Sequence, residues 1–359
     1  MRVNAIFAAA AVTLLSSASP DWSPSALAQG LVIDGETIAD AKLLAAAKAE
    51  GKIVMHGTRP SESIGPVFEA FQKETGIKID YVRGPSSKVY ERVLAEFAVN
   101  KLEFDYADLT DLTLIKEWVS RDVLAAHKVP WHDRIAAEIK HPEGKWYYIA
   151  RPVMVIGINT AEVAEKDFPK SWKESLDPKW KGKMGMQSID VGGSAFSLQA
   201  YLKMHVAEDA WPRLAQTEPR LYSAVSNVLT DLVRGRLGIG YLDASSVATQ
   251  IAAGAPLKMI FPSEGLVGFG VFGNATKTAP RPNAARLWVN YVTSKRGSSL
   301  MSTSGAYGTH PDATPPFAAG IKFPPQDKVW TIDPGKWDEI TQPWTAEWKD
   351  IVAKRSSVQ

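Results

Sequence analysis

Three arginines stand at or near the ends of predicted strands, where a protein of alternating strands and helices holds its ligands. They are Arg59, Arg83 and Arg151. A guanidinium can hold a carboxylate or a phosphoryl group with two parallel hydrogen bonds, although a single loop arginine is more often a solvated surface charge. We expect Arg59, beside Thr58, to be the main charged contact to a ligand and Arg151 to be a further candidate.

A second candidate for anion binding is the small-residue segment Gly192-Gly193-Ser194-Ala195, which leads into a predicted helix. Free backbone N–H groups and the helix dipole favour an anion at such a position. An ordinary glycine-rich turn with a serine cap explains the local sequence equally well. Gly193, Ser194 and Ala195 therefore stay candidates rather than an assignment.

Metal and covalent chemistry find little support in the sequence. The chain has six histidines, none in a helical metal-binding pair, and no cysteine, which excludes disulfides and thiolate sites. Residues 268–273 (Gly-Phe-Gly-Val-Phe-Gly) have dinucleotide-motif spacing, but Pro280 and Pro282 follow where a helix is needed, so a glycine-interrupted buried strand is predicted. There is no phosphate-binding Walker loop and no nucleophile elbow. We expect no catalytic residue, no metal site and no cofactor.

The elements that position these residues alternate between strand and helix. Predicted strands cover residues 52–55, 77–82, 104–109, 153–158, 183–187 and 237–242, and predicted helices cover 61–75, 88–99, 112–119, 195–205 and 244–253. Alternation with short connections predicts an α/β fold with a mostly parallel sheet covered on both faces. In such sheets, ligands bind in the loops at the carboxyl ends of the strands.

The first 28 residues have the layout of a signal peptide. Arg2 precedes an apolar run from Ala5 to Leu15, and Ala26-Leu27-Ala28 fits a cleavage site before Gln29. The apolar run is shorter than the roughly 20 residues of a membrane anchor. Cleavage would leave about 330 residues with a net charge of +2, which gives no electrostatic footprint for nucleic acid or a membrane surface.

Several segments, in their order along the chain, resemble the periplasmic solute-binding proteins of ABC importers, specifically the ferric-iron-binding class and its organic-ligand relatives. These segments are residues 52–57, 71–79, 104–108, 155–160, 178–183 and 284–291. The resemblance implies a two-lobed, type II periplasmic-binding-protein fold, in which each lobe is a mixed, mostly parallel sheet flanked by helices and hinge strands join the lobes. Lobe 1 would comprise residues 31–152 and 258–310, and lobe 2 would comprise residues 153–257 and 311–355. The protein would be a periplasmic monomer that passes its ligand to an inner-membrane permease.

The resemblance also implies which residues meet the ligand. Relatives place an anion on the loop that here reads Gly193-Ser194-Ala195. Ferric binders offer a histidine where this chain has Arg59, an acid where it has Thr110, and an adjacent tyrosine pair near Asp243 and Ala244. A guanidinium does not suit a trivalent cation, so we expect a small organic anion: a phosphonate, a phosphate ester or a carboxylate.

Three further residues complete the predicted site. Tyr241 stands alone, two positions before Asp243, and both are taken as ligand-binding candidates. Asp108 and Asp243 can each pair with an amine, which would suit a zwitterion such as an aminoalkylphosphonate, or each can cap a helix. Two alternatives stay open: a ferric-iron carrier that uses Tyr241 and His56, and a periplasmic enzyme that acts on a phosphorylated metabolite.

Overall fold

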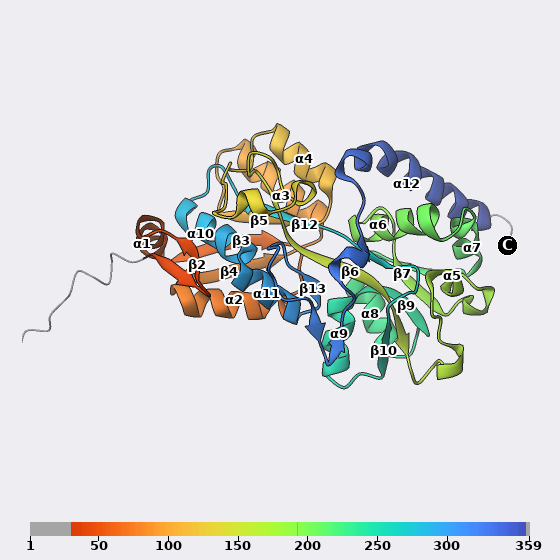
Figure 1. Cartoon of the computed structure of the whole chain (residues 1–359). Helices are drawn as coiled ribbons and strands as arrows, with labels where there is room; N and C mark the ends of the chain where they lie inside the picture. Colours follow the sequence, from red (N-terminus) through yellow and green to blue (C-terminus); the bar gives the residue numbers. More distant parts are fainter. Residues whose placement is uncertain (1–29, 192, 357–359) are drawn as a thin grey trace, which may run out of the picture.

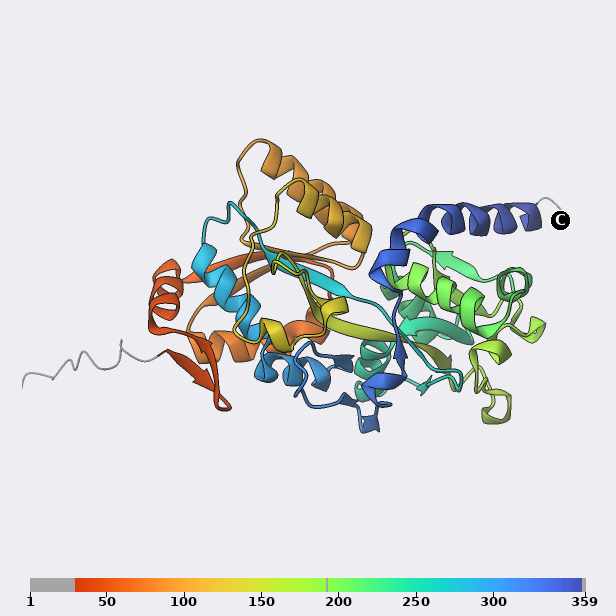
Figure 2. The ribbon, with the colours of Figure 1, turned by 45° about the horizontal axis from the view of Figure 1, so that its top comes forward.

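The structure is a computed structural model that describes residues 30–191 and 193–356, so the predicted signal peptide lies outside the described residues. Strands and helices alternate along the chain, which confirms the predicted α/β class. The molecule has two halves, and the long strand β6 (Tyr147–Asn159) runs from one into the other in both views (Figures 1 and 2). No helix in the described part of the chain is long and apolar enough to cross a membrane.

The first half is built on a mixed sheet in which β12 is inserted between β5 and β6. The strand order is β4 (Lys78–Arg83), β3 (Lys52–Gly57), β5 (Tyr106–Leu109), β12 (Val271–Ala275) and the beginning of β6. Strand β3 is parallel to β4 and β5, whereas β12 is antiparallel to both of its neighbours. The helices are α1 (Ala41–Glu50), α2 (Ser61–Thr75), α3 (Ser86–Ala98), α4 (Leu112–Ser120), α10 (Pro282–Thr293) and α11 (Lys295–Thr303), and the hairpin β1–β2 (Leu31–Ile33, Glu36–Ala39) precedes them.

The second half continues the sheet from the other end of β6. Strands β9 (Ile239–Asp243), β7 (Met184–Gln187) and β8 (Arg220–Tyr222) follow in that order, and β7 is parallel to both β8 and β9. Helices α5 (Trp172–Ser175), α6 (Gly193–Tyr201), α7 (Ala210–Gln216), α8 (Val225–Val233) and α9 (Ala244–Ala252) belong to this half. The last helix, α12 (Pro334–Ser356), packs on α6 and α7 and also reaches α4 of the first half (Figure 1).

The chain returns to the first half at Gly270. Before this residue, β10 (Leu257–Ile260) and β11 (Leu266–Gly268) pair with the second-half part of β6; after it, β12 pairs in the first half. The pairing thus puts residues 257–268 in the second half, whereas the family resemblance implies a return at residue 258. A Cβ on Gly270 would lie 2.7 Å from the Phe272 ring and 2.8 Å from the Tyr148 ring, so the crossing fits only glycine. The rest of the lobe division stays a prediction.

Large aromatic residues fill the core of both halves. Trp118, Trp172, Trp211, Trp288 and Trp348 are fully buried. None of them lines the cavity described below, so their role is packing. The rigid core that they form fixes the ends of the strands, and these ends carry the candidate site.

Candidate functional site

A cavity of about 230 Å³ lies where the two halves meet. Its wall comes from six loops, each of which follows the carboxyl end of a strand: β3, β4 and β5 in the first half, and β7, β8 and β9 in the second. Side chains of β6 and of the crossing around Gly270, including Met154 and Phe269, complete the wall with apolar surface. In open α/β sheets, ligands bind at this position, beyond the carboxyl ends of the parallel strands.

Five described helices begin at this cavity. Residues at the starts of α2, α3, α6, α8 and α9 line it. The N-caps of α2, α3 and α8 are Pro60, Pro85 and Ala224, and none of these makes a side-chain capping hydrogen bond. Since the first N–H groups of a helix lack partners within the helix and carry a partial positive charge, the cavity is set up to attract an anion.

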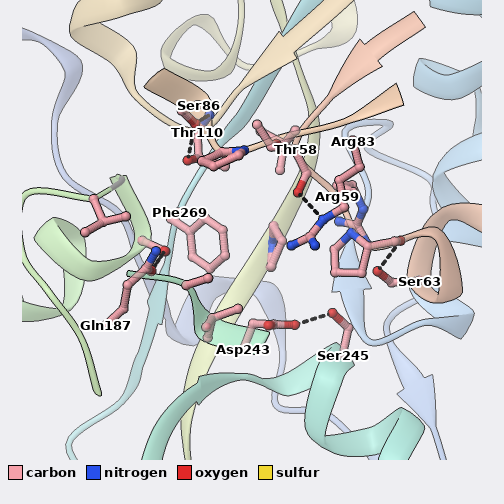
Figure 3. A pocket seen from close by; sticks show the side chains of 18 of the residues that line it. Thr58, Arg59, Ser63, Arg83, Ser86, Thr110, Gln187, Asp243, Ser245 and Phe269 are labelled. Atoms are coloured by element: carbon pink, nitrogen blue, oxygen red, sulfur yellow. Dashed lines mark hydrogen bonds between the residues drawn. The ribbon is translucent and has the colours of Figure 1, made fainter. Parts of the chain in front are cut away.

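Arg59 is a buried cation without a matching anion. Its residue surface is only 4% exposed, and the one hydrogen bond that its guanidinium makes to a described residue is a long one, 3.5 Å from Nη2 to Ser304 Oγ. The Nε and Nη1 atoms have no hydrogen-bond partner among the described residues. Burial lowers the pKa of the guanidinium, and nearby acidic groups, above all Asp243, oppose this shift. In Figure 3, Arg59 and Arg83 lie on one side of the cavity and Gln187 lies on the other.

Asp108 and Tyr81 hold the loop that carries Arg59. Asp108 Oδ1 accepts hydrogen bonds from the backbone N–H and the hydroxyl of Thr58, both at 2.8 Å, and the Tyr81 hydroxyl donates to the Arg59 carbonyl at 2.9 Å. A Cβ on Gly57 would lie 2.5 Å from Asp108 Oδ2, so this close packing requires glycine. Burial raises the pKa of Asp108 to about 6, against the hydrogen bonds from Thr58 and the charge of Arg59. Asp108 lies behind Thr58 and does not line the cavity.

The structure brings four of the eight predicted ligand-binding residues to the cavity wall. Thr58, Arg59, Ser194 and Asp243 line it. Asp243 also caps α9, since its Oδ1 accepts from the Ser246 N–H at 2.9 Å, so the helix-capping role and a place in the cavity go together.

Gly193, Ala195 and Arg151 lie near the cavity but not on its wall. A Cβ on Gly193 would come within 1.9 Å of the Thr110 carbonyl oxygen, so this glycine allows the two halves to touch. The Arg151 guanidinium instead lies over the Tyr307 ring, 5.8 Å from its centroid.

Tyr241 and His56 are in the core and are far from forming a metal site together. The Tyr241 hydroxyl shares a hydrogen bond of 2.7 Å with Ser175 Oγ, and burial raises the pKa of the phenol. The His56 ring packs on Phe104 with centroids 4.7 Å apart, and burial lowers the pKa of the imidazole. Neither residue lines the cavity. The described chain also contains no group of three or more His, Cys, Asp or Glu residues that could hold a metal ion.

Sequence reasoning missed one segment of the wall entirely. Ser223, Ala224 and Val225 line the cavity at the start of α8, a helix that the sequence analysis does not predict. A signal for it is present, because Val225, Val228 and Leu232 recur at helical spacing after small residues. Ser245 and Gln187 of the wall belong to predicted elements but are not among the predicted ligand contacts.

Comparisons with known proteins agree with this arrangement. The sequence profile of the bacterial extracellular solute-binding protein family matches residues 103–329. The Fe(3+)-binding periplasmic protein of Serratia marcescens is 20% identical over 273 residues, which cover 73% of this chain and 79% of that protein.

Two solved structures share the fold. The periplasmic binding protein AfuA from Actinobacillus pleuropneumoniae, with fructose-6-phosphate bound, has a TM-score of 0.71 and 19% identity, over 85% of this chain and 99% of AfuA. Iron-bound HitA from Pseudomonas aeruginosa has a TM-score of 0.66 and 17% identity, over 85% of this chain and 99% of HitA. These likenesses confirm the predicted type II periplasmic-binding-protein fold.

Proposed function

We propose that this chain, which belongs to the family of bacterial extracellular solute-binding proteins, captures a small organic anion in the periplasm and delivers it to the permease of an ABC importer. The anion is a phosphonate, a phosphate ester or a carboxylate. The observation that carries the proposal is the unpaired guanidinium of Arg59, buried in a cavity at which five helices begin.

The energetics of Arg59 favour an anionic ligand. Burial of a charge without a partner costs free energy, and an arginine cannot avoid this cost by losing its proton. A phosphoryl or carboxylate group at Nε and Nη1 would supply the missing hydrogen bonds in the two-pronged geometry that these groups share with a guanidinium. The cavity volume of about 230 Å³ is below the roughly 300–1,000 Å³ of pockets for drug-sized ligands, which favours a small molecule.

The relatives bind chemically different ligands, and the cavity of this chain resembles one kind more than the other. AfuA was solved with a sugar phosphate, HitA with iron. The described residues that line this cavity include two arginines and one carboxylate but neither tyrosine nor histidine. A ferric ion needs several anionic oxygen ligands, and phosphoryl or carboxylate groups need donors, so the donor set supports an anion. For the enzyme alternative, the described wall contains a hydroxyl–carboxylate pair, Ser245 and Asp243, but no histidine or lysine that could act as a general base.

Calorimetric titration tests the proposal, after a thermal-shift screen of small phosphonates, phosphate esters and carboxylates has found a ligand. A ligand at 100 times its Kd adds about 2.7 kcal/mol to stability. Arg59→Ala should weaken binding by about one to two powers of ten, because a charge-assisted hydrogen bond contributes about 1.5–3 kcal/mol. Arg59→Lys should recover only part of the affinity, because it loses the planar geometry. Arg236→Ala, at an exposed arginine that pairs with Asp231, is the control and should bind like the wild type.

Two results would contradict the proposal. One is affinity within twofold of wild type in Arg59→Ala. The other is a visible charge-transfer band on titration with ferric citrate, above all a band that Tyr241→Phe removes, which would favour the ferric carrier. Consumption of a phosphate ester during incubation would instead favour the enzyme.

A further inference from the structure

We propose that the ligand carries a protonated amine as well as its anionic group, and that Asp243 and Ser245 receive this amine. This inference rests on the anion-binding function proposed above and names the ligand class, a small zwitterion. It depends on which atoms at the α9 end of the cavity can donate hydrogen bonds and which can only accept them.

Asp243 is the only carboxylate among the described residues that line the cavity. Its surface is 8% exposed, and it forms no ion pair with a described residue within 4.0 Å. Its partners are neutral: Oδ1 accepts from Ser245 Oγ at 2.5 Å and from the Ser246 N–H at 2.9 Å, and Oδ2 accepts from Ser246 Oγ at 2.7 Å. The site thus contains a buried anion whose cationic partner is missing, just as it contains a buried cation in Arg59.

The hydrogen bonds around Asp243 determine whether the α9 end of the cavity offers donors or acceptors to a ligand. The Ser245 hydroxyl gives its one hydrogen to Asp243 (Figure 3), so toward the cavity it can only accept. A carboxylate has about four acceptor positions, and the three hydrogen bonds leave one on Oδ2 free. The α9 end of the cavity therefore offers acceptors, whereas Nε and Nη1 of Arg59 offer only donors.

The helix dipoles lead to the same division of the cavity. The structure describes the N-caps of α2, α3, α8 and α9 at the wall, and of these four helices α9 is the one with an acidic side chain as its cap. The charge of Asp243 offsets the positive end of α9, while the uncapped starts of α2, α3 and α8 stay favourable to an anion. Arg59 and Asp243 line the same small cavity, and of the nearby acidic groups Asp243 most strongly opposes the effect of burial on the pKa of Arg59, so one small molecule can contact both residues.

Matched pairs of probes test the inference by calorimetry. 2-Aminoethylphosphonate is compared with ethylphosphonate and with 2-hydroxyethylphosphonate, and γ-aminobutyrate is compared with butyrate. We expect the amine of the better-bound series to bind at least tenfold more tightly than its partners. Asp243→Asn should reduce this ratio to within about twofold, because the amide keeps an acceptor at Oδ1 but loses the negative charge. Asp111→Asn is the control, because Asp111 caps α4 in the same way, accepting from the Thr113 and Leu114 N–H groups, but does not line the cavity.

The possible failures are distinguishable. If wild type binds the alkylphosphonate or butyrate as tightly as the amine, the inference is overturned and the proposed anion-binding function stands. Equal binding of the hydroxyl and amine probes would point to a polyhydroxylated ligand and also overturn the zwitterion. An amine preference that survives in Asp243→Asn would remove Asp243 from the role. If neither these probes nor any anion of the screen binds, the proposed function itself fails.

Discussion

Each end of β5 has a buried aspartate with an arginine nearby, but only the two residues at the amino end form an ion pair. At the amino end, Asp105 is fully buried and binds Arg281, with 2.7 Å from Nε to Oδ2 and 2.8 Å from the backbone N–H to Oδ1. At the carboxyl end, Asp108 is equally buried and lies near Arg59, but its Oδ1 is taken by Thr58. The Arg59 guanidinium has no carboxylate within ion-pair distance in the described chain.

This difference shows how one strand serves two purposes. The pair at the amino end joins β5 to the start of α10 and satisfies both charges within the protein. At the cavity end, the chain uses its carboxylate to position the loop and leaves the cation for a partner from outside. The comparison predicts that the two arginines make contributions of opposite kind, one to stability and one to binding.

The largest expected effect is on stability, in Arg281→Met. Removal of one partner leaves Asp105 as a buried charge without its cation, which typically costs about 3–5 kcal/mol. We expect the free energy of unfolding, measured by chemical denaturation, to fall by about 3 kcal/mol, while ligand affinity of the folded protein changes less than twofold. An unfolding free energy within 1 kcal/mol of wild type would show that the two ends of β5 do not differ as described.

The same substitution at the other end, Arg59→Met, should have the reverse outcome. Because it removes an unpaired buried charge, we expect the stability without ligand to rise by about 1 kcal/mol, and ligand affinity to fall by about tenfold or more, as one lost charge-assisted hydrogen bond requires. Denaturation without ligand and calorimetry with it give the two numbers. A loss of stability comparable to that of Arg281→Met would mean that Arg59 is a structural residue.

A smaller effect is expected from the protonation of Asp108, whose pKa burial raises to about 6. As the pH falls from 7.5 to 5, Asp108 gains a proton and its negative charge near the anion site disappears, so anion affinity should rise, by up to about tenfold or 1.4 kcal/mol. A sulfonate probe keeps its own charge constant over this range. Asp108→Asn should bind the sulfonate probe equally at both pH values, because an amide does not titrate. Its oxygen can keep both Thr58 hydrogen bonds at the Oδ1 position, so the loop should stay in place.

The pH dependence of the stability of the ligand-free protein tests the direction of the Asp108 effect independently. The native state holds the Asp108 proton more tightly than the unfolded chain, so this group stabilises the fold fully below its unfolded pKa near 4, and the contribution is lost as the pH rises through about 6. A fall in anion affinity on acidification of the wild type would contradict the proposed effect of Asp108 protonation on binding.

The smallest effect should come from a hydrogen bond that joins the halves outside the cavity. The Trp337 indole N–H of α12 donates to Thr113 Oγ1 of α4 at 2.8 Å, and a hydrogen bond contributes about 0.5–1.5 kcal/mol. Trp337→Phe should favour separation of the halves and weaken binding about two- to fivefold, seen as faster ligand release in stopped-flow measurements. Trp344→Phe, which alters packing against Trp211 within the second half, is the control. Equal release rates in both variants would show that this hydrogen bond of α12 does not hold the two halves together around the ligand.

Much of the fold follows from local sequence signals. Gly51 and Gly76 end α1 and α2 in the left-handed conformation, with φ of 73° and 77°, as expected of glycines after helices. The alternation of strands and helices also predicts which loops meet at the cavity. Since each loop follows its strand directly, the sequence makes the short segments around Thr58 and Ser194 candidates for the wall, and both residues line it in the structure.

Local sequence signals do not predict which side chains reach the cavity and which are buried behind its wall. Tyr241 and Asp243 are two positions apart on β9 and share a face of the strand, yet only Asp243 reaches the cavity, because packing against Trp172 covers Tyr241. The sequence makes Asp108 a candidate to contact the ligand, but its carboxylate binds Thr58 and does not line the cavity. These outcomes depend on contacts between segments far apart in the chain, which periodicity does not encode.

The position of β12 in the sheet has a consequence for how the protein is made. Strand β12 lies between β5 and β6, although residues 271–275 follow both strands in the sequence. A nascent chain therefore carries β5 and β6 without the strand that joins them until about three quarters of its 359 residues have been synthesised. We expect helices such as α2 and α3, which depend on local contacts, to form before the first half completes its sheet, because that sheet requires this late, non-local pairing, which is intrinsically slow.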